Sequence, residues 1–203
     1  MKLYYSPGAC SLVSHILLRE AQLPHTLVKV DTGTHRTEQG VDYTTINPKG
    51  YVPLLELDDG QRLSEGPVIA QYIADHARRE DLMPAAGSMA RYRVMEWQNY
   101  ITSELHKSFS PLFNPALDAQ AKAIFTAALR KKFDWISSQL RGKPYLTGDD
   151  FTAADAYLFT VARWAKYVSL DLSDVEDLQA FLKRVASRPA VQDAMRAEGL
   201  PLA

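Results

Sequence analysis

The strand-forming patterns of this 203-residue chain are confined to its first eighty residues, and the pattern beyond residue 88 is helical. Short β-prone runs such as "KLYY", "HTLVKVD" and "PLLEL" all lie in the first third of the chain. The stretch "DLMPAAG", residues 81–87, then breaks the pattern with proline, alanine and glycine. We therefore predict a mixed α/β domain over 1–80, a linker over 81–87 and an all-α domain over 88–203.

The first domain is predicted to begin with a strand, a helix and a second strand. "KLYY" precedes the helically spaced run "SLVSHILLREAQ", and "HTLVKVD" follows Pro24. A crossover helix of this kind makes the two strands parallel. Next, "PLLEL" and "QRL" flank the turn residues Asp58-Asp59-Gly60, which favours a hairpin, before the amphipathic run "EGPVIAQYIADHA". This order predicts a small mixed sheet with helices, of thioredoxin-like shape.

The second domain is predicted to contain only helices. Thr152 is a good N-cap, Asp155 completes a capping box three residues later, and Phe151 is placed to pack on the first turn. The first of these helices is expected to bend or break near Pro111 and Pro115. The predicted helices cover residues 89–110, 119–142, 151–168, 175–187 and 189–198.

The chain contains a single cysteine, Cys10, which bears on its cellular compartment and on whether it forms disulfides or binds metal. With one cysteine no disulfide forms within the chain, and Cys/His metal-binding spacings are absent, so we expect a reducing, cytoplasmic environment and no metal. The N-terminus lacks the apolar run of a signal peptide, and no run reaches the length of a membrane span. The net charge of −1, with both signs interspersed, argues against a nucleic-acid partner.

Cys10 has two open interpretations. In "YYSPGACSLVSH" it follows a Pro-Gly turn and precedes a helix, where free N–H groups and the helix dipole favour a thiolate with a lowered pKa. Alternatively, it is a small buried apolar residue. Val13 occupies the place of the second cysteine in a CxxC pair, which disfavours a dithiol oxidoreductase.

Two further motifs have both a structural and a functional interpretation. Val52-Pro53 opens a strand; in a thioredoxin-like domain this peptide bond is typically cis and exposes the backbone groups of Val52 to an extended peptide ligand. In "LSEGP", Ser64 or Glu65 is either an ordinary helix cap or, with the free N–H groups, a site for the carboxylate and ammonium groups of a ligand.

One face of the long predicted helix is polar. Such a face is usually solvated, but this one is rich in side chains that make directional hydrogen bonds. If the helix lines a cleft, His106 becomes a candidate donor or base. The residues of this face are Glu96, Asn99, Ser103, His106 and Lys107.

Five segments together resemble the cytosolic glutathione transferases, most closely the bacterial beta class. They are "MKLYYSPGACSL", "NPKGYVPLL", "LSEGPVIAQYIAD", "SELHKSFSPLF" and "FTAADAYLF", and the resemblance covers essentially the whole chain. It implies a thioredoxin-like domain followed by an all-α domain, a homodimer, and glutathione as the co-substrate. It also implies that small hydrophobic electrophiles are the second substrates, in a detoxification reaction.

The resemblance also implies roles for individual residues. Cys10 lies beside the glutathione sulfur and is able to form a mixed disulfide with it, and His106 is close to that sulfur. Val52, before the cis-proline Pro53, pairs with the cysteinyl backbone, while Glu65 and Gly66 hold the γ-glutamyl end. Tyr5 and Ser11 are implied to donate hydroxyl hydrogen bonds near the sulfur. The implied helical wall of the site consists of Asn99, Ser103 and Glu104, and Lys107 adjoins this wall without a specified role.

His35 is a departure from the family pattern. Related sequences often carry a lysine near this position, facing the glycyl carboxylate of glutathione. A neutral imidazole attracts a carboxylate less than an ammonium group does, so we expect somewhat weaker glutathione binding, most of all at high pH. Arg36 is a possible substitute.

Three functions follow from this interpretation. The first is conjugation of the glutathione thiolate to apolar electrophiles. The second is glutathione-dependent thiol transfer or peroxide reduction through a Cys10 mixed disulfide. The third is a non-enzymatic binding or regulatory protein of the same fold, which would not need the glutathione-contacting residues that this chain carries.

Overall fold

The computed structural model describes residues 1–202, which form two compact units. The first unit comprises Met1–Met83 and the segment that begins at Ala186, and the second comprises Pro84–Val185. The change near residue 84 lies within the predicted boundary region. The C-terminal segment, which the sequence assigned to the all-α domain, groups with the first unit, because its helix Pro189–Ala197 packs against the helix Ser11–Glu20. The physical reason is long-range packing of the last helix, which a local sequence pattern does not encode.

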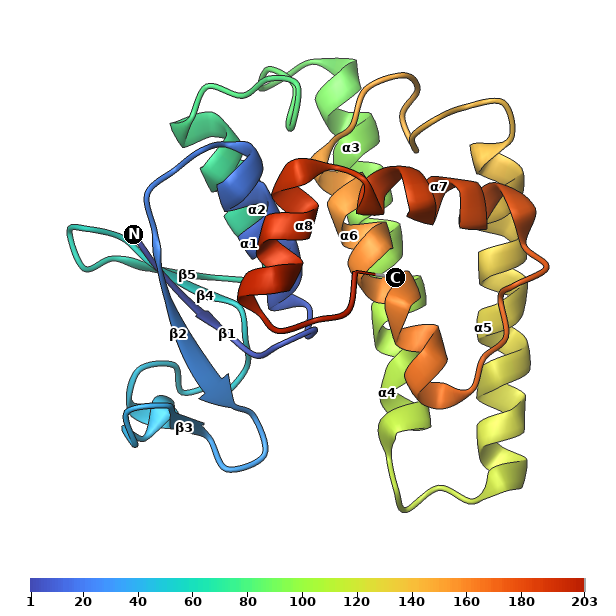
Figure 1. Cartoon of the computed structure of the whole chain (residues 1–203), viewed down its shortest axis with the longest axis horizontal. Helices are drawn as coiled ribbons and strands as arrows, with labels where there is room; N and C mark the ends of the chain where they lie inside the picture. Colours follow the sequence, from blue (N-terminus) through green and yellow to red (C-terminus); the bar gives the residue numbers. More distant parts are fainter. Residues whose placement is uncertain (203) are drawn as a thin grey trace. The chain divides into compact units, whose positions relative to one another are not determined.

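A five-stranded sheet with the order β3-β2-β1-β4-β5 forms the centre of the first unit (Figure 1). The parallel pairing of β1 with β2 places Leu3 opposite Leu27, as the predicted crossover requires. β4 is antiparallel to β1 and to β5, which confirms the predicted hairpin. Short β3 and the 3₁₀ turn η1 were not predicted. The bounds are β1 Lys2–Tyr5, β2 Thr26–Asp31, β3 Arg36–Thr37, η1 Tyr43–Thr45, β4 Leu54–Glu56 and β5 Arg62–Ser64.

Three helices accompany this sheet: α1 (Ser11–Glu20), α2 (Gly66–His76) and α8 (Pro189–Ala197). α1 packs against both α2 and α8, and Figure 1 shows α8 beside α1. The predicted packing residues of α8, Val191, Ala194 and Met195, are fully buried. Burial of this apolar face of α8 is the driving force that attaches the C-terminal segment to the first unit.

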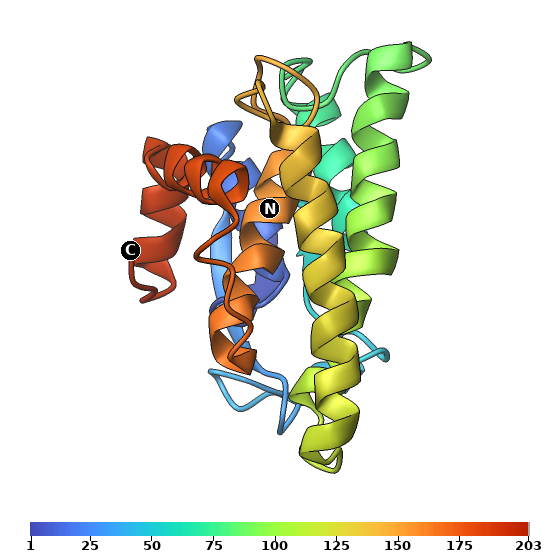
Figure 2. The same ribbon diagram turned by 90° about the vertical axis from the view of Figure 1, so that its right-hand side faces the viewer.

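The second unit is entirely helical. Its elements are α3 Met89–Tyr100, the π-helix η2 Ile101–His106, α4 Lys107–Phe113, α5 Ala119–Leu140, α6 Ala153–Ala162, the 3₁₀ helix η3 Arg163–Val168 and α7 Glu176–Ala186. Figure 2 shows α5 running back alongside α3 and α4, and the contacts between α4 and α5 agree. The first three elements thus replace the single predicted helix over 89–110.

The predicted break near Pro111 and Pro115 is confirmed, because α4 ends at Phe113 and Asn114 is extended, but an earlier change of the backbone pattern at Ile101 was not predicted. Two side chains explain the change. The Thr102 hydroxyl donates to the Gln98 carbonyl at 2.8 Å, and the Ser103 hydroxyl donates to the Asn99 carbonyl at 3.1 Å. Such bonds to the preceding turn compete with the backbone N–H groups of the helix.

The start of α6 confirms the predicted capping box of Thr152 and Asp155. The Asp155 carboxylate is fully buried and accepts hydrogen bonds from the Thr152 N–H, the Thr152 hydroxyl and the Leu146 N–H, each at 2.8 Å. It therefore joins the preceding loop to the first turn of a helix whose ten residues are all buried.

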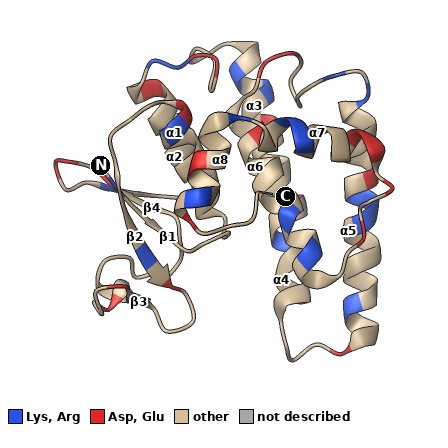
Figure 3. Cartoon of the chain, viewed as in Figure 1, with Lys and Arg blue, Asp and Glu red and all other residues tan. Residues whose placement is uncertain are grey.

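Charged residues of both signs are interspersed on the ribbon of each unit (Figure 3), as the net charge of −1 suggests. Within residues 1–202, none of the helices combines the length and the apolar character needed to cross a membrane.

Candidate active site

The pairing of three strands brings the predicted residues of the first unit to one end of its sheet. Tyr4 of β1 pairs with Leu54 of β4, and Leu54 pairs with Ser64 of β5. Since β4 is antiparallel to both neighbours, the end of β1, the start of β4 and the end of β5 lie together. Tyr5, Val52-Pro53 and Glu65 are therefore neighbours at this sheet end, although the sequence separates them widely.

The turn between β1 and α1 carries Cys10 to this end. The Ser6 N–H donates to the Ser11 Oγ at 3.1 Å, and the Ser11 hydroxyl donates to the Ser6 carbonyl at 3.2 Å. Ser11 is fully buried and its hydroxyl hydrogen is occupied by this bond. Ser11 thus fixes the turn that precedes the helix, and its role as a hydroxyl donor to the ligand stays a prediction.

Cys10 occupies the N-cap position of α1, and its thiol donates to the Val52 carbonyl at 3.1 Å. Burial raises the pKa of Cys10 to about 11, although hydrogen bonds from the N–H groups of Cys10 and Ser11 act in the opposite direction. The expected lowering of this pKa was therefore wrong. Desolvation of the thiolate outweighs the helix N-terminus, so Cys10 is a protonated thiol at neutral pH.

The Val52-Pro53 peptide bond is cis, as the thioredoxin-like domain predicted. Val52 is buried and its carbonyl accepts the Cys10 thiol hydrogen. Its N–H has no acceptor among residues 1–202. A backbone donor and acceptor at the end of a sheet are the groups that pair with an extended peptide.

Glu65 ends the hairpin in an unusual backbone conformation. Its φ is +70°, which side chains other than glycine seldom adopt, and Gly66 then begins α2. The exposed carboxylate pairs with the Lys49 ammonium group at 2.8 Å, and the same ammonium group donates to the Ser64 hydroxyl at 3.1 Å. Lys49 was not predicted, although it stands within the quoted motif "NPKGYVPLL".

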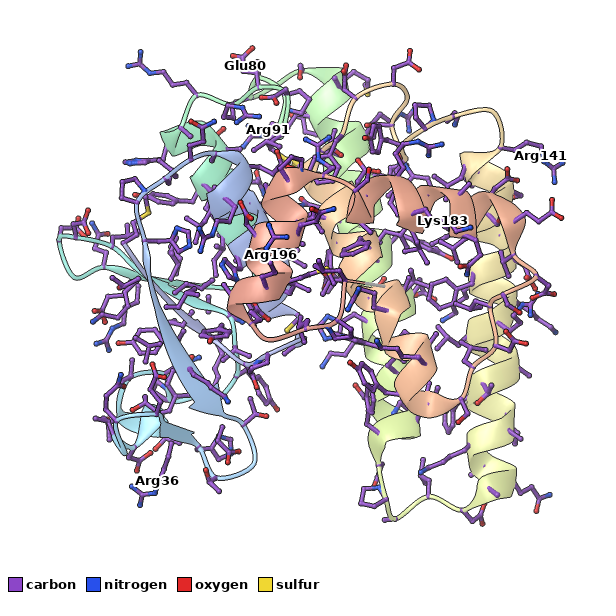
Figure 4. All side chains as sticks on the ribbon, viewed as in Figure 1. Arg36, Glu80, Arg91, Arg141, Lys183 and Arg196 are labelled. Carbon is purple, nitrogen blue, oxygen red and sulfur yellow. The ribbon has the colours of Figure 1, made fainter. Side chains whose placement is uncertain are left out.

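His35 follows β2 and is half-buried, with φ +53°. Its ring lies so close to Gly50 that a Cβ atom there would approach the imidazole Cε1 to 2.8 Å. The Nδ1 atom of His35 is buried without a partner among the described residues. Arg36, the predicted substitute, is exposed, donates to the Gly40 carbonyl at 3.0 Å and extends outward in Figure 4.

Tyr5 is buried at the end of β1. Burial, together with the negative charges of Glu198 and Glu38, raises the pKa of its hydroxyl. Tyr5 therefore stays protonated at neutral pH and is suited to donate a hydrogen bond.

Glu198, which the sequence did not identify, ties the C-terminal segment to the Cys10 turn. Its carboxylate is fully buried, accepts from the Gly8 N–H at 2.9 Å and lies 2.9 Å from the His15 Nδ1. Glu198 and Gly8 are 190 residues apart in the sequence. His15 stands in the quoted motif, but no local pattern connects it with Glu198.

We expect Glu198→Ala to lower the free energy of unfolding by about 2–4 kcal/mol, because it removes the buried partner of the His15 Nδ1 and the acceptor of the Gly8 N–H bond. Glu198→Gln retains an acceptor and should lose less. Urea unfolding midpoints measure this, with Glu80→Ala as the matched control, because Glu80 is exposed and points outward in Figure 4. Equal midpoints for Glu198→Ala and Glu80→Ala would contradict the structural role.

His106 is the central residue of the predicted set in the second unit. Its Nδ1 lies 2.7 Å from the Tyr157 hydroxyl, and its ring packs edge-on against Trp164 with centroids 4.8 Å apart. Burial, and then the positive charge of Lys107, lowers the pKa of His106 to about 4. The imidazole is therefore neutral at physiological pH. Tyr157, another partner that the sequence did not identify, is 51 positions away.

The other predicted residues of the second unit lie on the same helical segment. Asn99, Ser103 and Lys107 are exposed, and the Ser103 hydroxyl donates to the Asn99 carbonyl. The Glu104 carboxylate pairs with Lys132 of α5 at 2.9 Å, and the Lys132 side chain holds the pKa of this carboxyl below its usual value. Glu104 thus has a structural partner.

Two family models match the chain: glutathione S-transferase, N-terminal domain, over residues 8–76, and glutathione S-transferase, C-terminal domain, over residues 114–196. A relative named glutathione S-transferase GstA, from Escherichia coli O157:H7, is 50% identical over 98% of this chain and 100% of that protein. A sphingomonad glutathione S-transferase solved in complex with glutathione has a TM-score of 0.94 and 43% identity, over 99% of this chain and 100% of that chain.

A bacterial beta class glutathione S-transferase from Sphingomonas chungbukensis has a TM-score of 0.95 and 42% identity, over 99% of this chain and 100% of that chain. The chain therefore belongs to the glutathione S-transferase family, and its resemblance to the bacterial beta class is confirmed.

Proposed function

We propose that this protein is a glutathione transferase, an enzyme that conjugates the glutathione thiolate to apolar electrophiles. The observation that carries the proposal is the sheet end of the first unit, which offers a group of suitable chemistry to each part of glutathione. Its backbone groups at Val52, the carboxylate of Glu65 and the first turn of α2 match an extended, zwitterionic tripeptide. Family membership at 50% identity to a named glutathione S-transferase supports the same function.

Binding exchanges contacts that the structure already contains. The γ-glutamyl ammonium group takes the place of Lys49 at the Glu65 carboxylate, and Gly66 at the start of α2 receives the γ-glutamyl carboxylate. The cysteinyl N–H and C=O pair with the Val52 carbonyl and N–H. Before the ligand binds, the Val52 carbonyl accepts the Cys10 thiol hydrogen. When the cysteinyl N–H of glutathione takes this carbonyl, the Cys10 thiol is available to donate to another acceptor. His35 remains the proposed contact for the glycyl carboxylate.

The released thiol has a role in the reaction. Its pKa of about 11 keeps Cys10 protonated, so Cys10 donates a hydrogen bond to the glutathione sulfur, as do Tyr5 and His106 in this proposal. Donors to a thiolate lower the pKa of that thiol. The thiol proton leaves to solvent, the sulfur forms a bond to an electrophilic carbon, and a leaving group such as chloride departs with its electron pair. Ser103, Asn99 and Glu104 complete the proposed glutathione-binding set.

The experiment supplies glutathione and a chlorinated nitroaromatic compound, and measures conjugate and released chloride, which are expected in equal amounts. Protein inactivated by unfolding provides the background rate. No turnover above that background with a panel of electrophiles would remove this proposal. Retention on glutathione resin without turnover would instead support the non-enzymatic alternative.

A second candidate function rests on the Cys10 position. Its sulfur lies 3.1 Å from the Val52 carbonyl, the backbone group proposed to bind the cysteinyl residue of glutathione. Cys10 is therefore placed to form a mixed disulfide in thiol transfer or peroxide reduction. We propose that Cys10 serves both reactions. In conjugation its thiol donates a hydrogen bond, whereas in thiol transfer it first gives its proton to solvent, its sulfur attacks the glutathione sulfur of a mixed disulfide, and the other thiol of that disulfide leaves as a thiolate.

The proposal also covers the cellular compartment, the oligomeric state and the partners of the enzyme. We propose a cytoplasmic homodimer that acts in detoxification, without a nucleic-acid, membrane or metal partner. The single cysteine and the assembly implied by the family resemblance support it. Sedimentation at micromolar concentration measures the dimer, and a monomer at that concentration would contradict it.

A further inference from the structure

We propose that the Tyr157 hydroxyl holds His106 in the tautomer with its hydrogen on Nε2, so that His106 donates a hydrogen bond to the ligand sulfur and does not act as a base. Tyr157 is then a positioning residue, which acts on the reaction through His106. The role toward the sulfur rests on the proposed function, whereas the tautomer is a property of the second unit itself.

The pair is held firmly within the second unit. His106 is the last residue of the π-helix η2, and π-helical segments often occur at functional sites. Tyr157 is buried in α6, which packs against η2, and its hydroxyl approaches the His106 Nδ1 to 2.7 Å. Trp164 packs edge-on against the imidazole, with ring planes at 73°. These contacts define the orientation of the ring.

Hydrogen-bond chemistry assigns the proton between the two residues. A phenolic hydroxyl is a strong donor, and an unprotonated imidazole nitrogen is a better acceptor than a phenolic oxygen. The separation of 2.7 Å is typical of a hydroxyl donor and shorter than the usual N–H···O distance. Tyr157 therefore donates to Nδ1. The single hydrogen of a neutral imidazole must then be on Nε2.

The neighbouring Thr102 hydroxyl does not change this assignment. It lies 3.3 Å from the Tyr157 hydroxyl but only 2.8 Å from the Gln98 carbonyl. Because the carbonyl accepts but does not donate, the Thr102 hydrogen is directed to Gln98. Its contact with Tyr157 is longer than the contact between Tyr157 and Nδ1.

The charges around the ring favour the neutral form. Lys107 is next in the chain, and the nearby charges on α5 and η2, Lys132 and Glu104, neutralise each other in an ion pair. Burial and Lys107 together lower the pKa of His106, so the ring carries one hydrogen across the physiological range. Among residues 1–202, Nε2 has no hydrogen-bond partner, and its hydrogen is available to a ligand.

The tautomer is tested first by nuclear magnetic resonance of ¹⁵N-histidine-labelled, full-length protein without glutathione. His106→Asn identifies the His106 signals among the five histidines. We expect an unprotonated Nδ1 and a protonated Nε2 in the wild type, and nitrogen signals that shift toward the average of both tautomers in Tyr157→Phe. Tyr92→Phe is the matched control because Tyr92 is an exposed tyrosine of the same unit. A protonated Nδ1 in the wild type would overturn the assignment, as would unchanged signals in Tyr157→Phe.

The second measurement tests the consequence for the reaction. In Tyr157→Phe we expect kcat to fall by about tenfold, the KM for glutathione to stay within about twofold, and the apparent pKa of bound glutathione to rise by about one unit. An unchanged pH profile and kcat would overturn the positioning role. If no variant, including the wild type, forms conjugate, the proposed function fails, while the tautomer is still decided by resonance.

Discussion

Replacing Asp155 with alanine is expected to lower the free energy of unfolding by about 3–5 kcal/mol, the largest effect of any single change proposed here on stability. The Asp155 carboxylate accepts three hydrogen bonds, from the Leu146 N–H and from the N–H and hydroxyl of Thr152. The alanine side chain leaves all three donors buried without a partner. It also removes the capping box from the start of α6, a helix buried along its whole length.

Two variants make this test specific. Asp155→Asn keeps one acceptor oxygen but turns an NH₂ group toward donors, so its loss should be smaller than that of alanine. Asp150→Ala is the control, because Asp150 is an exposed aspartate of the same loop and should change stability by less than about 0.5 kcal/mol. Chemical unfolding at neutral pH measures all three. Similar midpoints for Asp155→Ala and Asp150→Ala would contradict the structural role of the carboxylate.

The same carboxylate predicts a pH dependence. Burial raises the pKa of Asp155 to about 6, above its ordinary value of 3.8, although its three donors act in the opposite direction. The folded state therefore binds a proton that the unfolded state releases between these pH values. The contribution of Asp155 is complete below the unfolded pKa and decreases as the pH rises through about 6. The stability difference between wild type and Asp155→Asn should accordingly be smaller at pH 7 than at pH 4.

Cys10→Ser is expected to abolish thiol transfer, with a loss of at least about a hundredfold, and to retain conjugation within about tenfold. A serine oxygen cannot form or resolve a disulfide, so the mixed-disulfide route ends. Its hydroxyl still donates a hydrogen bond, as does the protonated thiol it replaces. Tyr5 and His106 remain as further proposed donors.

The two reactions are measured on the same preparations, with a glutathione mixed disulfide as one substrate and a chlorinated nitroaromatic compound as the other. Mass spectrometry of wild-type protein incubated with oxidised glutathione should detect one added glutathione, and the serine variant should show none. Equal losses in both reactions would mean that Cys10 has a single role. Retained thiol transfer in Cys10→Ser would exclude Cys10 as the nucleophile.

Features that depend on neighbours in the chain were predictable from the sequence. The parallel pair β1 and β2, the hairpin at Asp58-Asp59-Gly60 and the capping box of Thr152 and Asp155 each depend on residues within a few positions of one another, or on one short crossover. The order of motifs around Cys10 and Val52-Pro53 identified the family for the same reason. Local hydrogen bonds and side-chain spacing leave direct traces in the sequence.

The tertiary structure decided what depends on segments that are distant in the chain. It attached α8 to α1, joined Glu198 to Gly8 and His15, and paired His106 with Tyr157. It also raised the pKa of Cys10, which the sequence had predicted to be lowered. The reason is that all segments that exclude water from the Cys10 thiolate, including distant ones, make this charged form less stable. The sequence by itself determined which groups this protein possesses and their local conformation, while burial by remote segments decided their protonation and their partners.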